Sequence, residues 1–213
     1  MQSVNFRFFT RTGRGAVLAL VALVAAGCAD QDVTAPTVLE TPSFSVSQES
    51  ATLFETNGVL GPAWGTATIR RGPQGVQVQL TVTDPAVHAA LEGNAISIWV
   101  ASFHNPAACT PGPHCIGTDL DVPATEAALQ LGGGRVLGSG PITFAINVRE
   151  GDTKNQIRGT AAGLVDAETD EIHVVIRRHG PPVPGLVDDQ ISTPAGGCSV
   201  TQLCSDVAVA IFF

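Results

Sequence analysis

The chain has 213 residues, of which 44% are hydrophobic and 14% charged, and its net charge is −8 at pH 7. Residues 28–213 alone have a net charge of −11, because the first 27 residues hold three of the 11 basic residues and none of the 19 acidic ones. Nucleic-acid binding needs a basic surface, so no nucleic-acid partner is expected. About 165 residues remain for the folded part, enough for one domain with a sizeable core.

Residues 1–27 have the layout of a secretory signal peptide. Three arginines and no acidic residue precede the apolar run AVLALVALVAAG, which is too short to span a bilayer. The run leads into AAGC, which matches the lipobox of bacterial lipoproteins, where the signal is cleaved and Cys28 is acylated. An ordinary secretory signal with a coincidental cysteine is the alternative. Ala29 replaces the aspartate that retains enteric lipoproteins at the inner membrane, so we expect a cell-envelope protein anchored in the outer membrane.

Residues 28–48 are expected to be a tether. They are rich in Thr, Ser, Pro and acidic residues and have no sustained hydrophobic period, a composition typical of disordered linkers. We therefore expect a signal peptide over 1–27, a lipidated Cys28 with its tether over 28–48, and a folded domain over 49–213. The domain has no second apolar run of membrane-spanning length, so lipid on Cys28 is the expected contact with the membrane.

Several segments alternate apolar and polar residues with the period of two that a half-buried strand requires. GVQVQLTVTD is the clearest, and after AWGTATIRR and the turn GPQG it predicts a hairpin over residues 63–83. PITFAINVRE and the C-terminal SDVAVAIFF repeat the pattern, the latter with Val207, Val209 and Ile211 on one face. NAISIWVASF is more continuously apolar, as expected for a central strand covered on both faces.

Two short helices are expected between the strands. In DPAVHAALEG, Asp84 is at the N-cap position, Pro85 is in the first turn and Gly93 is the stop signal. ATEAALQLGGG, residues 124–134, is the second candidate. With SATLFET and RGTAAGLV counted, eight or nine strands are predicted. Many short strands with little helix predict an all-β fold, an antiparallel β-sandwich with one or two short helices.

Four cysteines follow Cys28 in two similar pairs, Cys109 with Cys115 in CTPGPHC and Cys198 with Cys204 in CSVTQLC. Disulfides are the usual state in exported proteins, and four cysteines allow three connectivities. We predict pairing within each pair, because short loops with Gly and Pro bring the Cα atoms close enough. The alternative is a four-thiolate zinc site, although zinc sites favour two to four residues between ligands and each pair here has five.

The segment EIHVVIRRHG holds two histidines, His173 and His179. On a strand they would share the face opposite Ile172, Val174 and Ile176. Six residues separate them by roughly 20 Å, which is too far for one metal ion. A zinc or copper ion at His173 would need ligands from neighbouring strands, and the candidates are His104, Glu171, Asp119 and Asp189. The other interpretation is a structural histidine at 173 and a strand end at 179.

The runs NAISIWVASFHNPAAC, EIHVVIRRHGPPVPGLVDDQIST and GGCSVTQLC resemble a group of uncharacterised bacterial secreted proteins and lipoproteins. That group carries Trp-x-x-x-Phe-Asn-Asn-Pro-x-x-Cys, Glu-Ile-His-x-x-x-Arg-x-His-Gly-Pro and Gly-Gly-Cys, and this chain departs from it with His104 in place of Asn and Asn94 in place of His. The arrangement is also distantly similar to CHRD domains, which are β-rich modules. The resemblance implies a β-rich exported domain in which His173, His179, Gly180, Pro181 and Gln190 belong to the shared pattern.

No complete catalytic motif is present in the sequence. Ser139 lies in GSG without the Gly-x-Ser-x-Gly spacing of a nucleophile elbow, and GGGRVLGSG lacks the Lys-Ser/Thr of a phosphate-binding loop. We therefore expect a lipid-anchored, non-catalytic binding or envelope-associated module whose partner is a protein or a small molecule. The alternative is a metal-binding or metal-dependent protein with its site centred on His173.

Overall fold

The computed structural model describes residues 46–56, 60–199, 202 and 204–213. The expected signal peptide, Cys28 and most of the expected tether lie outside these ranges. The first strand begins at Ser47, two residues before the expected start of the domain. The strands are β1 Ser47–Thr56, β2 Leu60–Gly72, β3 Gly75–Val82, β4 Ala95–Phe103, β5 Ala127–Val136, β6 Thr143–Arg149, β7 Gln156–Gly159, β8 Glu171–Arg178 and β9 Ser205–Phe212.

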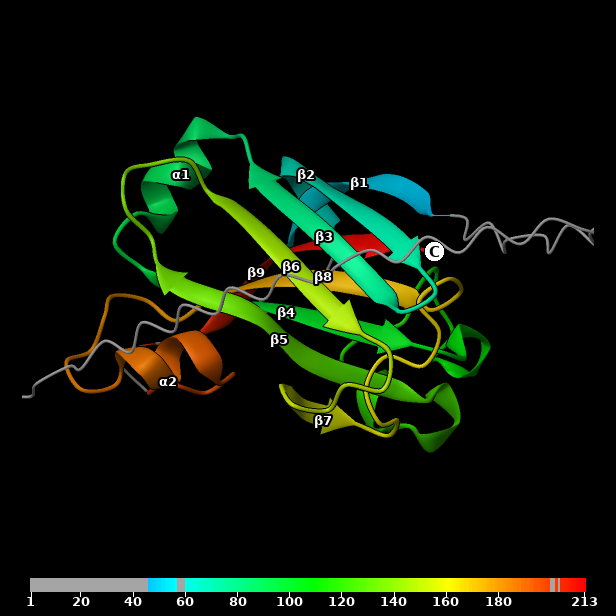
Figure 1. The fold of residues 1–213 in the computed structure, drawn as a ribbon. Helices are drawn as coiled ribbons and strands as arrows, with labels where there is room; N and C mark the ends of the chain where they lie inside the picture. The colour runs from blue at the N-terminus through cyan, green and yellow to red at the C-terminus, as the bar shows by residue number, and fades with distance from the viewer. Residues whose placement is uncertain (1–45, 57–59, 200–201, 203) are drawn as a thin grey trace, which may run out of the picture. The chain divides into compact units, whose positions relative to one another are not determined.

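The all-β, antiparallel prediction is confirmed, although the strands form one curled sheet rather than two separate sheets. Their order within the described residues is β6-β3-β2-β1-β9-β8-β4-β5-β7 (Figure 1). Strand β1 joins the two halves, because it pairs with β2 along most of its length and with β9 through Phe54↔Val209 and Glu55↔Ala208. The register of β1 against β2 shifts after Leu53, and such an irregularity lets a strand bend between two sheet directions.

The main core lies between the two halves of the curled sheet. Leu80 and Ile146 from β3 and β6 belong to the same apolar cluster as Ile98 and Val174 from β4 and β8, and each is at most 2% exposed. The halves also meet where β5 passes β6, because a Cβ atom on Gly132 would touch the side chain of Ile146. The core therefore has the two-sided character expected of a sandwich while the backbone remains one sheet.

One of the two helix predictions is confirmed and the other is wrong. Helix α1, Pro85–Leu91, begins at Asp84, whose Oδ1 accepts hydrogen bonds from the N–H groups of Ala86 and Val87 at 2.7 and 3.2 Å. ATEAALQLGGG instead forms most of β5, which pairs with β4 throughout and with β7. These long-range pairings override the local helix preference of the alanines. The second helix is α2, Val187–Ser192, which was not predicted.

The two faces of β8 and β4 are buried by different parts of the chain. Ile172, Val174 and Ile176 face the main core, as predicted, and the prediction that β4 is covered on both faces is also confirmed. In β9 the three residues expected on one face are divided between the two faces. Val207 lies in the main core with Ala208 and Ala210, whereas Val209 and Ile211 point to the outer face of the sheet.

Two segments cover parts of this outer face. The loop 104–126 lies over one end of β4, where Leu120 and Cys115 contact Ala101 and Phe103. Helix α2, in the segment that follows β8, lies beside β5 at the other end (Figure 1). Each segment contains a local disulfide, Cys109–Cys115 and Cys198–Cys204, with Cα–Cα distances of 5.3 and 5.5 Å. The predicted local pairing is thus confirmed, and the four-thiolate zinc alternative is wrong.

Within the ranges given above, no helix combines the length and apolar character needed to cross a bilayer.

Candidate functional site

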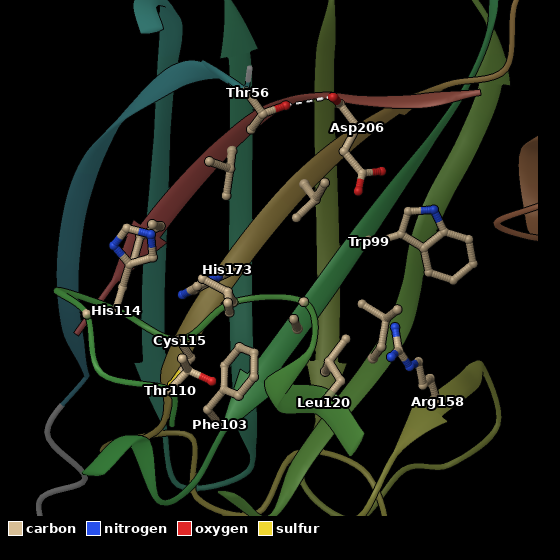
Figure 2. Close-up of a pocket in the computed structure, with 18 of the residues that line it drawn as sticks. Thr56, Trp99, Phe103, Thr110, His114, Cys115, Leu120, Arg158, His173 and Asp206 are labelled. Atoms are coloured by element: carbon tan, nitrogen blue, oxygen red, sulfur yellow. Dashed lines mark hydrogen bonds between the residues drawn. The ribbon is translucent and has the colours of Figure 1, made fainter. Parts of the chain in front are cut away.

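A cleft of about 940 Å³ lies on the outer face of the sheet, between the two covering segments (Figure 2). Its roof is the disulfide loop 110–117. Its floor is apolar and comes from four adjacent strands, β5, β4, β8 and β9. The floor includes Trp99, Phe103, Leu129, Val175, Val209 and Ile211.

The strand register arranges the floor in rows. Trp99 pairs with Val175, which pairs with Val209, and the next row along the strands runs from Ala101 through His173 to Ile211. Side chains in one row point to the same face because directly paired residues share a side of the sheet. His173 is therefore a polar residue in the middle of an apolar floor. The small Ala101 beside it leaves space between larger neighbours.

Glu171 holds the ring of His173. The Nε2 atom of His173 lies 2.6 Å from Oε1 of Glu171, and the backbone N–H of Cys115 donates to the same oxygen at 2.7 Å. Burial acts to raise the pKa of Glu171, but the bonds from His173 and Cys115 and the nearby His173 and His114 rings hold that pKa below its usual value. The carboxylate is therefore charged at neutral pH, so His173 donates through Nε2–H. Its Nδ1 atom has no hydrogen-bond partner among the described residues.

His114 faces His173 from the roof. It is half-buried, and its ring centre lies 5.8 Å from that of His173 at an interplanar angle of 67°. In the view of Figure 2 the two histidines lie on one side of the cleft, with Trp99 and Arg158 on the other. His114 was not predicted, because CTPGPHC was interpreted only through its two cysteines. Its position directly before Cys115 was the available signal, since closing the CTPGPHC loop fixes this residue.

A buried carboxylate holds the roof in place. One oxygen of Asp119 accepts hydrogen bonds from N–H and Oγ1–H of Thr110 at 2.9 and 2.6 Å, and the other accepts from the N–H of Ile116 at 2.8 Å. Burial acts to raise the pKa of Asp119, but these bonds outweigh it and lower the pKa. Asp119 is a structural residue that ties both ends of the loop together, not a ligand beside His173.

Charged side chains at the rim of the cleft pair with each other. Nη1 of Arg177 lies 2.6 Å from Oδ1 of Asp206, and its Nε donates to the carbonyl of Pro194. Arg158 pairs with Asp121. The lining therefore combines an apolar floor with cations that already have anionic partners.

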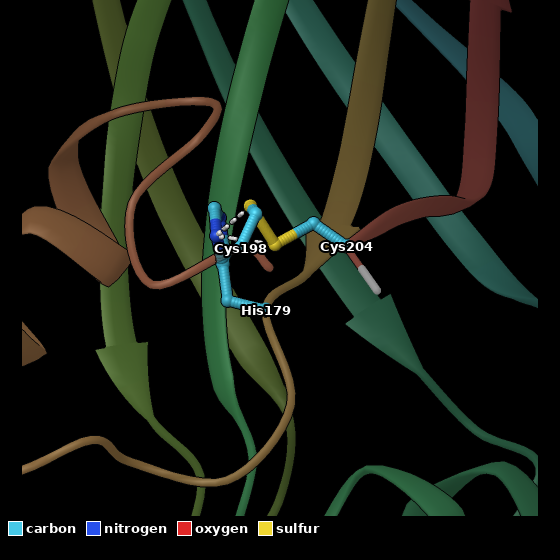
Figure 3. A group of neighbouring side chains, drawn as sticks. All are labelled: His179, Cys198 and Cys204. Carbon is cyan, nitrogen blue, oxygen red and sulfur yellow. Dashed lines mark hydrogen bonds between the residues drawn. A yellow bond between two sulfur atoms is a disulfide. The ribbon is translucent and has the colours of Figure 1, made fainter. Parts of the chain in front are cut away.

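His179 does not line the cleft that holds His173. The interpretation that the strand ends at this position is confirmed, because β8 ends at Arg178, and His179 is completely buried. Its Nε2 lies 2.7 Å from Ser97 Oγ, and its Nδ1 lies 3.0 Å from the carbonyl of Gly196. Figure 3 shows it beside the Cys198–Cys204 disulfide. Because both sulfurs are in a disulfide, this group offers no thiolates to a metal.

His104 and Asp189 are not brought to His173 as shared ligands. Nδ1 of His104 pairs with the buried Asp170 at 2.8 Å. Asp189 is an exposed residue of α2. In the described part of the chain, the two groups of three side chains close enough to hold one ion both contain disulfide cysteines, and neither includes His104 or His173. The expected ligand set is thus not assembled.

Gln190 and the Gly-Gly-Cys sequence lie in one closely packed part of the structure. The completely buried Gln190 accepts from the N–H of Val183 and donates to the carbonyl of Pro181. A Cβ atom on Gly196 would overlap the backbone of Asp189, and Gly197 has a φ of +67°. The Gly-Gly-Cys sequence is therefore required for close packing of the loop against α2.

Compared with protein-family models, curated proteins and solved structures, the chain has no significant match to any of the three.

Proposed function

We propose that the protein is an extracytoplasmic binding module that holds a small, neutral, largely apolar molecule in the outer cleft. Lipid on Cys28 anchors it to the cell envelope, on the outer-membrane side indicated by Ala29. The signal-like segment 1–27 supports the location, and two disulfides agree with an oxidising compartment. We also propose that the chain is related to the secreted bacterial proteins that it resembles and, more distantly, to CHRD domains.

The observation that carries the proposal is the cleft itself. Its volume of about 940 Å³ lies within the range of roughly 300–1,000 Å³ typical of small-molecule sites. Apolar side chains on the outer face of a sheet would ordinarily be covered by protein or replaced by polar residues. Here the two disulfide-closed segments cover both ends of that face and leave its centre open.

The neutral character of the ligand follows from the charges at the rim. Arg177 and Arg158 have carboxylate partners in Asp206 and Asp121, so a charged ligand would have to break an existing ion pair. A neutral molecule would gain burial of apolar surface without that cost. Among the described residues, no hydroxyl or thiol is hydrogen-bonded to His173, and this supports binding rather than nucleophilic catalysis.

The test is a titration of the full chain with the neutral fluorophore N-phenylnaphthylamine, in which binding is measured by the increase in the fluorescence of the probe. Ala101→Phe fills the floor between Trp99 and Phe103, and Val175→Gln introduces a polar amide there. Each should lower the probe affinity by about tenfold or more, because a loss of about 1.4 kcal/mol of binding free energy is sufficient for a tenfold change. The matched control is Ala145→Phe on the exposed side of β6, which should leave binding unchanged.

Two results would overturn the proposal. One is a probe affinity that neither cleft variant changes while both remain folded by circular dichroism. The other is a dimer in light scattering that Ala101→Phe dissociates, because the cleft would then be covered by a second copy of the chain.

A further inference from the structure

We propose that the end of the cleft at His114 and His173 is a site for one divalent transition-metal ion of the zinc and copper class. His173 binds through Nδ1 and His114 through a ring nitrogen from the roof. This inference goes beyond the proposed function, because it uses polar atoms that the apolar ligand does not need.

The first argument is the way in which Glu171 fixes His173. Histidines that bind metals almost always donate their other ring N–H to a carboxylate, a backbone carbonyl or water, which sets the tautomer and makes the ligating nitrogen more basic. Nε2 of His173 makes this bond with Glu171 at 2.6 Å. The lone pair is then on Nδ1, which has no hydrogen-bond partner in the described residues. A purely structural histidine in an apolar floor would more often have both nitrogens satisfied.

The second argument is the distance between the two rings. With metal–nitrogen bonds of about 2.0–2.1 Å, two imidazoles on one ion hold their ring centres roughly 5 to 6.5 Å apart. The centres of His114 and His173 are 5.8 Å apart. No hydrogen bond of the His114 ring to another described residue competes for its nitrogens. This pair therefore replaces the pairing of His173 with His104 that the sequence suggested.

The third argument is that both ligands are held before any ion binds. Phe103 packs against His173 with ring centres 5.2 Å apart. The loop that carries His114 is closed by the Cys109–Cys115 disulfide, and the N–H of Cys115 bonds to Glu171. The carboxylate of Glu171 thus positions both His173 and the loop that carries His114. The remaining coordination positions open into the cleft, where water fills them.

Imidazole nitrogen suits zinc, copper and nickel, and the general order of affinities places Cu²⁺ above the other two. We therefore expect Cu²⁺ to bind more tightly than Zn²⁺, with one ion per chain for each metal. Two protein ligands leave the ion accessible, so it should exchange with chelators in solution.

The experiment is isothermal titration of the full chain, without a histidine tag and exported to the periplasm, with Zn²⁺ alone and with Cu²⁺ alone. His114→Ala and His173→Ala should each weaken binding by at least about tenfold, and Glu171→Gln should weaken it about 10- to 100-fold. His88→Ala is the matched control, because His88 is on α1 and bonds to the carbonyl of Val82. It should leave the affinity unchanged.

Thermal melting of each variant shows whether it folds. Because His114 is a half-buried loop residue, its variant tests the site even if His173→Ala does not fold. Absence of stoichiometric binding would overturn the inference, and so would an affinity that His114→Ala leaves unchanged. Probe binding is measured with chelator present, so failure of the metal site and failure of the proposed function are distinguishable.

Discussion

The side chains of Ser97 and His179 are both completely buried, and Ser97 Oγ lies 2.7 Å from Nε2 of His179. Ser97 Oγ accepts a hydrogen bond from Nε1–H of Trp99 at 2.8 Å. His179 in turn donates from Nδ1 to the carbonyl of Gly196 at 3.0 Å. Burial lowers the pKa of His179, and in the neutral imidazole Nε2 then accepts a hydrogen bond from the Ser97 hydroxyl. This chain of bonds links the cleft floor to the C-terminal disulfide loop.

The first prediction concerns acid stability. Burial lowers the pKa of His179, and Arg177 lowers it further, against a smaller opposing effect of the bond to Gly196. In the unfolded chain the pKa returns to about 6.5. The unfolded state therefore binds more protons as the pH falls below about 6.5, and the stability due to neutral His179 is lost there. His179→Asn should remove this part of the pH dependence, measured by urea unfolding at about pH 8 and pH 5.

The second prediction concerns His104, whose contribution to stability is lost as the pH rises rather than as it falls. The hydrogen bond with Asp170 raises the pKa of His104 above its usual value, against a smaller effect of burial. A raised pKa stabilises the fold below the unfolded value of about 6.5, and this contribution is lost as the pH rises through the folded pKa. His104→Asn should cost about 1 kcal/mol at pH 5.5 and less at pH 8.5. Equal costs at both pH values in urea unfolding would contradict the assignment.

The sequence predicts a helix or strand correctly where local interactions determine its conformation, and fails where long-range pairing determines it. β3 and α1 were predicted because their alternation and capping are local properties. β5 was mistaken for a helix because its conformation is set by pairing with β4 and β7, and its glycines make room for α2 and β6. The faces of β9 were not predicted for a similar reason. A register shift against β8 puts Val207 in the main core with the alanines, while Val209 and Ile211 face the cleft.

The third prediction concerns Arg71, which is 1% exposed. Its Nε pairs with Glu49, and its Nη1 donates to the carbonyls of Ala167 and Asp170 at 3.2 and 2.8 Å. Arg71→Ala should lower the free energy of unfolding by about 3 kcal/mol, because buried acceptors lose their donor. The control is Arg70→Ala, at the exposed neighbouring position, which should change it by no more than about 0.5 kcal/mol. Equal losses in chemical denaturation would show that Arg71 makes no special contribution.

The fourth prediction concerns the two disulfides. Replacing either pair by serines should lower stability by up to about 2 to 3 kcal/mol, because each closes a short loop. Removing Cys109–Cys115 should also weaken binding of the fluorescent probe, since this loop is the cleft roof. Removing Cys198–Cys204 should affect probe binding less. Denaturation and probe titration of both double variants test this, and a roof variant that binds as well as the native chain would contradict the roof assignment.

The candidate site was only partly predictable from the sequence. His173 was singled out by its place on the strand, and Glu171 was named as a possible metal ligand, whereas the structure shows Glu171 bonded to the His173 ring. The partner histidine could not be predicted, because His114 reaches the site through a folded loop. His104 and Asp189 were reasonable candidates by residue type. In the structure His104 pairs with Asp170, and Asp189 is exposed on α2, so neither is a ligand beside His173.

The most direct measurement is a methyl NMR titration of the full chain with N-phenylnaphthylamine, because neighbouring residues on one strand report opposite faces of the sheet. A ligand in the outer cleft should shift the methyl signals of Val175, Val209 and Ile211 and leave those of Val174 and Ile172, which face the core, nearly unchanged. Shifts centred on the core-facing methyl groups, or no saturable shifts in the cleft, would contradict a binding site on the outer face.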